Sequence, residues 1–386
     1  MRNATPAGKG SRSADANMRK RNFFWPSIQQ ELLLRAALDT GPAAREAWTT
    51  WRAVADYDAL DEGTLRLIPL LQANLQRLGI DDLLVSRMCE TQRVSWYWNT
   101  QLMLRLKNVL TSFTSAGIET ILLKGLPLAL AYYDALDLRP VGDLDLMIRH
   151  RDWAAAIGIL TSAGWRTEEG DAEPLRRSMH AVAFKDRTGF EIDLHLSIFH
   201  ECIEPEKLEP FWRGSVPLVR GNITSQILCS ADQLLHCLAH GLRANDVSPV
   251  RWVADAVTIL RREPRLDWPR LLDQTQRLRL GLPVSTGLNY LALTFPGLIP
   301  NEPLTQLSRY RPGLLEHVEW FARRHEHLTG QGARVGIFFR RYEGKPLAAK
   351  LAAVPSYFAD TFGTKSAMQT IFVAGQKSLK ALKGFF

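Results

Sequence analysis

The sequence has few cysteines and none in a paired motif. Its 386 residues include four, Cys89, Cys202, Cys229 and Cys237, and no two of them form a Cys-x-x-Cys pair. Cysteines this sparse exclude a disulfide scaffold. Because free cysteine is usually buried, we expect reduced thiols packed in the interior. The cysteine content therefore indicates a reducing compartment, the cytoplasm.

Long apolar runs are also missing. A membrane span needs about 18–20 consecutive apolar residues, and the best run, 121–133, is interrupted by Lys124, Gly125 and Pro127. No apolar segment follows the cationic N-terminus, so it lacks the pattern of a secretory signal. With 46% hydrophobic and 23% charged residues, the composition is that of a globular protein. A chain of this length predicts two or three domains.

The net charge of +8 is carried by the ends of the chain. Residues 1–22 have a net charge of +5 and residues 340–386 a net charge of +6, which leaves −3 for the middle. Tracking nucleic-acid phosphates requires a cationic surface, so we do not expect nucleic acid as a partner. The basic C-terminal segment, with Lys377, Lys380 and Lys383, is typical of peripheral contact with an anionic membrane or of a solvated helix.

The periodicity of apolar residues changes twice along the chain. Three- and four-residue spacing predicts helices over 28–54, 63–78 and 81–116. Short apolar or alternating runs predict strands at 119–124, 143–149, 180–185 and 190–196, with helices at 126–133 and 153–163 between them. Helical patterns return beyond residue 200. We predict a disordered basic arm (1–22), an N-terminal helical region (23–116), an α/β core (117–200), a C-terminal helical region (201–345) and a basic amphipathic tail (346–386).

Two aspartates stand two residues apart in the second predicted strand. Asp143 and Asp145 share one face because strand side chains alternate, while Leu144 and Leu146 face a core. Neighbouring carboxylates repel each other unless a cation lies between them. Oxygen ligands suit Mg²⁺, which binds one or two carboxylates together with substrate phosphates. Acidic pairs are also common on solvated strand ends, so the pair needs support from other residues.

Asp193 offers a third carboxylate from the fourth predicted strand. Its neighbours Ile192 and Leu194 are apolar, which places it opposite the core together with Glu191 and His195. Three carboxylates can hold two metal ions about 3.5–4 Å apart, as in-line displacement requires. His195 is a candidate for hydrogen-bonding support or for proton transfer, and Glu191 is a further candidate for support.

Cationic residues ahead of the aspartates predict an anion site. Lys124 and Gly125 stand at a strand-to-helix junction, where free backbone N–H groups, a close approach at glycine and an ammonium favour phosphate. Arg139 is a candidate for a phosphate contact or for a structural salt bridge. His236 and His240 share a helix face, and this spacing can bind zinc. The segment, however, has no glutamate at the second position of an HExxH motif and offers no third ligand. We expect them to pack against the α/β core and to line a substrate cleft.

The order of these motifs is similar to a known superfamily. The segments are LLKG (122–125), Tyr132 with Tyr133, Arg139, GDLDLMI (142–148) and EIDLHLSIF (191–199). Together they resemble the nucleotidyltransferase superfamily that includes DNA polymerase beta, and more closely a bacterial group of uncharacterised nucleotidyltransferases. Weaker resemblance extends into the helical flanks at 64–75 and 232–260. Two positions depart from the pattern: Leu126 stands where a serine usually follows the glycine, and Leu196 replaces an aromatic residue.

The resemblance implies an α/β fold with a small mixed-sheet nucleotidyltransferase core and extensive N- and C-terminal helical regions. It implies that Asp143, Asp145 and Asp193 are catalytic and bind two Mg²⁺ (or Mn²⁺) ions, and that Lys124 and Gly125 hold phosphates. The implied reaction moves a nucleoside monophosphate from an NTP such as ATP to a hydroxyl or amine of an unidentified acceptor, a small molecule, saccharide or peptide. The alternatives are a catalytically idle nucleotide-binding or scaffold protein of this fold and a terminal nucleotidyltransferase that acts on nucleic acid.

Overall fold

A computed structural model describes residues 24–167, 180–199, 202, 204–243 and 247–324, with single residues and a short stretch between 338 and 357. The basic arm predicted at 1–22 and most of the tail predicted at 346–386 lie outside these residues. Among the helices that the structure describes, none combines the length and the apolar character of a membrane span.

The N-terminal region is helical, as predicted, but the predicted segments are divided. The helices are α2 (Ile28–Leu38), α3 (Gly41–Val54), α4 (Glu62–Leu65), α5 (Ile68–Arg77) and α6 (Leu83–Ser115), with a 3-10 turn η1 (Tyr57–Ala59). Gly41, with φ +58°, separates α2 from α3, and Pro69 stands at the start of α5. Both residue types favour a helix boundary at these positions.

Within the described part of the chain, six strands form one mixed sheet in the order β3-β4-β2-β1-β6-β5. They are β1 (Thr120–Leu123), β2 (Leu144–Ile148), β3 (Ala181–Lys185), β4 (Glu191–His195), β5 (Val216–Arg220) and β6 (Ile223–Ile227). The first four match the predicted strands. The prediction of helices alone beyond residue 200 is wrong, because β5 and β6 form a hairpin and β6 pairs in parallel with β1. Gly221 and Asn222 make the tight turn between them, with φ +56° at the glycine.

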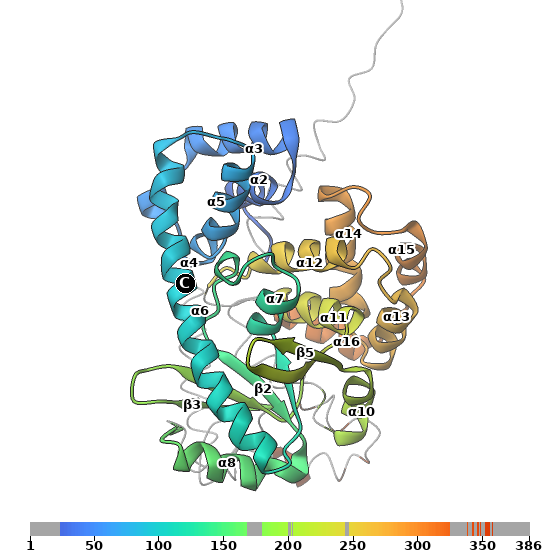
Figure 1. Ribbon diagram of the computed structural model, residues 1–386. Helices are drawn as coiled ribbons and strands as arrows, with labels where there is room; N and C mark the ends of the chain where they lie inside the picture. Colours follow the sequence, from blue (N-terminus) through green and yellow to red (C-terminus); the bar gives the residue numbers. More distant parts are fainter. Residues whose placement is uncertain are drawn as a thin grey trace, which may run out of the picture.

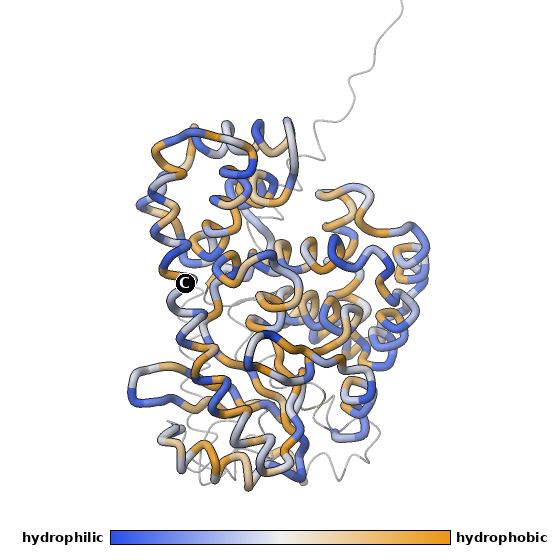
Figure 2. The backbone as a smooth tube through the Cα atoms, viewed as in Figure 1, coloured by the Kyte–Doolittle hydropathy of each residue, from blue (hydrophilic) through white to orange (hydrophobic). Residues whose placement is uncertain are grey.

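The two faces of the sheet pack against different helices (Figure 1). One face carries Leu122, Leu144 and Leu146, which pack with residues of α6 and of α8 (Trp153–Ser162). The other face carries Ile121, Leu123 and Met147, which belong to a core shared with α11 (Ser230–Gly241) and α12 (Arg251–Arg262). Figure 2 shows hydrophobic and hydrophilic residues alternating along the helices, as expected where each helix buries one side.

The remaining helices pack against the elements already described or against one another. The elements are α7 (Gly125–Ala131), η2 (Leu136–Leu138), η3 (His150–Asp152), α10 (Pro205–Gly214), α13 (Trp268–Arg277), α14 (Gly281–Thr294), α15 (Asn301–Ser308) and α16 (Leu314–Arg324). Helices α11 and α12 lie very close together, since a Cβ atom on Gly241 would stand 2.2 Å from Cβ of Trp252. This close packing fixes the two helices that face the acidic side of the sheet.

Candidate active site

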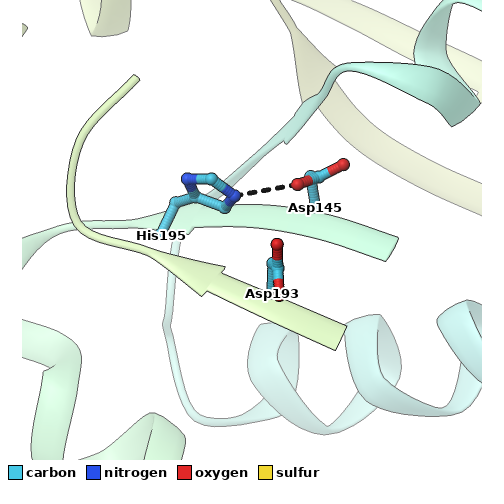
Figure 3. Close-up of side chains that lie close together, drawn as sticks. All are labelled: Asp145, Asp193 and His195. Atoms are coloured by element: carbon cyan, nitrogen blue, oxygen red, sulfur yellow. Dashed lines mark hydrogen bonds and ion pairs between the residues drawn. The ribbon is translucent and has the colours of Figure 1, made fainter. Parts of the chain in front are cut away.

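The sheet brings the predicted acidic residues together at three neighbouring strands. Parallel pairing of β2 with β4 sets Asp145 opposite Asp193, and antiparallel pairing of β1 with β2 sets Leu123 opposite Asp145. Lys124 directly follows Leu123, so it emerges beside the two carboxylates. Figure 3 shows the side chains of Asp145, Asp193 and His195 gathered on one side of these strands.

The ammonium of Lys124 lies between two carboxylates. Its Nζ contacts Oδ1 of Asp145 and stands 3.7 Å from Oδ2 of Asp193. The backbone of Lys124 has φ 52° and ψ −117°, a conformation that residues other than glycine rarely adopt, at the turn from β1 into α7. In this structure the lysine is therefore a counter-ion for the acidic cluster, and its role in phosphate binding stays a prediction.

His195 supports Asp145, whereas Glu191 pairs elsewhere. The imidazole is fully buried, and its Nε2 lies 2.9 Å from Oδ1 of Asp145, while Nδ1 lies 3.2 Å from the carbonyl oxygen of Ser197. Because an ionised carboxylate can only accept hydrogen bonds, Nε2 donates the hydrogen bond to Asp145 and orients that side chain. Glu191, two residues before Asp193 on the same face, forms an ion pair with Lys185 of β3 at 3.6 Å.

The acidic cluster has the donors that a divalent ion needs. Ligand atoms of Asp145, Asp193 and His195 all lie within 4.8 Å of one another. Oδ2 of Asp145 is buried and has no hydrogen-bond partner among the described residues, so it is available to a cation. The two carboxylates form an oxygen-only set, which fits Mg²⁺ or Mn²⁺ better than a thiophilic metal, while Nε2 of His195 stays bound to Asp145 and is not a ligand. Asp143 is not part of this group, although it lies directly before β2.

Charge and burial shift the pKa values of the cluster in opposite directions. The negative charge of Asp145, followed by burial, raises the pKa of Asp143 to about 7. Burial also acts to raise the pKa of Asp145, but Lys124 and His195 outweigh it and hold that pKa below its usual value. Burial raises the pKa of Asp193. Asp145 is therefore firmly ionised, whereas Asp143 and Asp193 hold their protons more readily. A cation bound beside them would favour ionisation of all three carboxylates.

A cavity of about 360 Å³ opens beside the acidic cluster. Its sheet-side wall includes Lys124, Gly125 and Asp143. Residues of α11, of α12 and of the segment before α12 form most of the other walls: Gln233, His236, Cys237, His240, Gly241, Val247, Ser248, Pro249, Arg251, Trp252 and Asp255. Four residues from earlier in the chain complete the lining: Arg66 after α4, Leu128 of α7, and Arg139 and Gly142 ahead of β2. The expectation that His236 and His240 line a cleft is confirmed, and neither belongs to a metal-sized cluster among the described residues.

Arg139 forms the salt bridge that the sequence left open as an alternative. Its Nε and Nη2 donate to the two carboxylate oxygens of Asp255 at 2.8 Å each, and the hydroxyl of Tyr133 donates to the same carboxylate at 2.8 Å. Nη1 of Arg139 faces Gly125, where a Cβ atom would lie only 2.8 Å away, and it has no hydrogen-bond partner among the described residues. Arg139 therefore has one donor left for a ligand in the cavity.

Two residues of α12 were missed by the sequence reasoning. Arg251 and Asp255 are four apart, so they share one helix face, and both line the cavity. Burial, with repulsion from Arg139, lowers the pKa of Arg251 to about 10. Nη1 of Arg251 donates to the carbonyl oxygen of Pro140 at 2.7 Å. The available signal was a charged pair at this spacing inside an otherwise apolar helical segment.

Of three comparisons with known proteins, one identifies a family. The family model described as "Uncharacterised nucleotidyltransferase" matches residues 64–296, which contain the whole sheet, α11, α12 and every residue of the site. No curated protein matches the chain. Among solved structures, an antigenic nucleotidyltransferase-like protein from Paracoccidioides brasiliensis is 15% identical, with a TM-score of 0.34, over 54% of this chain and 91% of that chain.

Proposed function

Since the chain belongs to the uncharacterised nucleotidyltransferase family, we propose that it moves a nucleoside monophosphate from an NTP to a hydroxyl or amine of an acceptor and releases pyrophosphate. The observation that carries this proposal is the register of β2 and β4, which sets Asp145 opposite Asp193 beside a cavity with cationic walls. We propose a small molecule, a saccharide or a peptide as the acceptor.

Asp145, Asp193 and Asp143 are the proposed metal ligands. Their carboxylates would hold divalent ions, Mg²⁺ or Mn²⁺ and two in number, which when bound would neutralise charge on the triphosphate. The buried free oxygen of Asp145 and the spacing of the Asp145, Asp193 and His195 ligand atoms support this assignment. His195 keeps Asp145 in one orientation through its 2.9 Å hydrogen bond.

The other residues of the site have complementary tasks. The acceptor oxygen or nitrogen forms a bond to the α-phosphorus while the bond from that phosphorus to the bridging oxygen of the β-phosphate breaks. Asp193 would take the acceptor proton, and the 22% exposure of its side chain supports this role. Lys124, the backbone N–H groups at the start of α7 and the cations Arg139 and Arg251 provide positive charge for the pyrophosphate that leaves.

Calorimetry and product analysis test this function together. We expect the wild-type protein to bind an NTP in the presence of Mg²⁺ and the Asp143→Ala/Asp145→Ala variant to lose that binding. The control is Asp81→Asn, an exposed aspartate outside the cavity. If the double variant binds as tightly as the wild type, the metal role is wrong.

The acceptor is sought with α-labelled NTPs and a cell extract, followed by mass analysis of labelled species. We expect a labelled product and pyrophosphate from the wild type, and loss of both in Asp193→Asn, which changes a partly exposed carboxylate and disturbs the fold least. Binding of the NTP without pyrophosphate release across an acceptor panel would instead support an idle nucleotide-binding protein.

A further inference from the structure

Helix α11 carries a buried glutamine whose side chain is unpaired. Gln233 has no exposed surface yet lines the cavity, and neither its amide nitrogen nor its carbonyl oxygen has a hydrogen-bond partner among the described residues. A buried polar group left unpaired loses its hydrogen bonds to water without replacing them, which destabilises the fold. Folded proteins rarely keep two such atoms on one side chain unless water or a ligand pairs with them.

His236 lies one helical turn after Gln233 on α11, and the two residues form one wall of the cavity. His236 is 2% exposed, and its Nε2 also has no hydrogen-bond partner among the described residues. The rings of Phe199 and His240 meet it edge to face at centroid distances of 5.6 and 5.7 Å, so its orientation is fixed. Burial, together with the charge of Lys124, lowers the pKa of His236 to about 3. The wall is therefore polar but uncharged.

The position of this wall is fixed by contacts on the rest of α11. Asp232, the residue before Gln233, is fully buried and accepts hydrogen bonds from Nε and Nη2 of Arg270 at 3.0 and 2.6 Å. At the start of the helix the hydroxyl of Tyr132 donates to Oγ of Ser230 at 3.2 Å. The part of α11 that carries Gln233 is thus held in place before any ligand arrives, which lowers the entropy cost of binding.

We propose that Gln233, with His236 beside it, binds the base of the NTP. This inference rests on the proposed nucleotidyl transfer. It adds the position of the base, which is the uncharged end of the NTP. The cationic part of the same cavity, with Arg139 and Arg251, suits phosphates, whereas the neutral α11 wall suits a base. A carboxamide presents a donor next to an acceptor, which complements the adjacent acceptor and donor on a base edge, as in glutamine–adenine pairs. A volume of about 360 Å³ lies in the range of small-molecule sites.

The first test replaces Gln233 by methionine and measures binding of the four NTPs and of inorganic tripolyphosphate, each with Mg²⁺. We expect the wild type to favour one base, and Gln233→Met to lose at least tenfold in affinity for that NTP while its affinity for tripolyphosphate is unchanged. Because methionine has a similar volume and no unpaired polar atoms, the thermal midpoint should not fall. The matched control is Gln72→Met, an equally buried glutamine of α5 outside the cavity.

A second variant tests which hydrogen bonds Gln233 donates to the base and which it accepts. Gln233→Glu replaces the donor and acceptor pair by a group that only accepts when ionised, so preference should move toward a base edge with two adjacent donors, as in guanine. The four NTPs are compared again by calorimetry.

The possible outcomes separate the two proposals. If Gln233→Met keeps the wild-type preference among the NTPs, cavity water pairs with the amide and the base assignment is wrong. If the wild type binds neither the NTPs nor tripolyphosphate, the proposed function fails and the base assignment fails with it. If tripolyphosphate binds as tightly as every NTP, the phosphate site stands and the base assignment alone is overturned.

Discussion

At the scale of single residues, Lys124 has an unfavourable backbone conformation but a favourable position for its charge. A side chain at φ 52° and ψ −117° costs on the order of 1–3 kcal/mol relative to ordinary regions. The conformation brings the ammonium to Asp145 and Asp193 and lets α7 begin at Gly125, where Arg139 needs a residue without Cβ. We interpret the strain as the cost of placing a cation between two strand carboxylates.

Two variants at this position separate backbone strain from charge. Lys124→Gly and Lys124→Ala both remove the ammonium that neutralises Asp145 and Asp193, but only glycine relieves the left-handed backbone. We expect both to unfold more easily than the wild type, with Lys124→Gly more stable than Lys124→Ala by about 1 kcal/mol or more. Urea denaturation measures the difference. An alanine variant at least as stable as the glycine variant would show that the backbone is not strained.

At the scale of elements, periodicity predicted those helices and strands that bury one side. The alternation in β2 and β4 placed Asp145, Asp193 and His195 correctly on one face, because strand geometry is local. The strand β5 was missed because only Leu218 is buried along it and Pro217 interrupts the pattern, as happens at sheet edges. The partner of Arg139 could not be foreseen, since Asp255 is 116 residues away and meets it only through the packing of α12.

The ion pair between Arg139 and Asp255 connects the segment before β2 to α12, and its removal should loosen that connection. Asp255→Ala leaves the buried guanidinium of Arg139 without a counter-ion, so we expect a loss of about 3–5 kcal/mol in unfolding free energy. Replacing both partners, as in Arg139→Met/Asp255→Leu, should recover much of that loss. A double-mutant cycle in urea measures the coupling.

The same variants decide the role of Arg139. If the double variant folds and binds the NTP as tightly as the wild type, the arginine is structural and Nη1 does not contact phosphate. If each single variant costs less than about 1 kcal/mol, the pair does not stabilise the packing of α12, contrary to expectation.

At the scale of the whole molecule, the cavity unites groups that titrate in opposite senses. The pKa of His236 is lowered to about 3 in the folded protein, whereas that of a free histidine is about 6.5. Between these two pH values the unfolded chain binds more protons than the folded one, so the free energy of unfolding rises with pH. The pKa of Asp143 is raised to about 7 by Asp145 and burial, so its contribution to stability falls as pH rises from about 3.9 to 7. The two slopes oppose each other in the metal-free protein.

Removing one titrating group should therefore expose the slope of the other. In EDTA we expect His236→Gln to lower the slope of unfolding free energy against pH between pH 4 and 6 by up to about 1.4 kcal/mol per pH unit, because glutamine does not titrate. Asp143→Asn should raise the slope over the same interval by a comparable amount. The groups facing His236 remain in both variants; they are Lys124, Asp145, His195, His240 and Arg243. Denaturant titrations at half-unit pH steps give the slopes, and parallel curves for the wild type and His236→Gln would show that this imidazole is solvated and titrates normally in the fold.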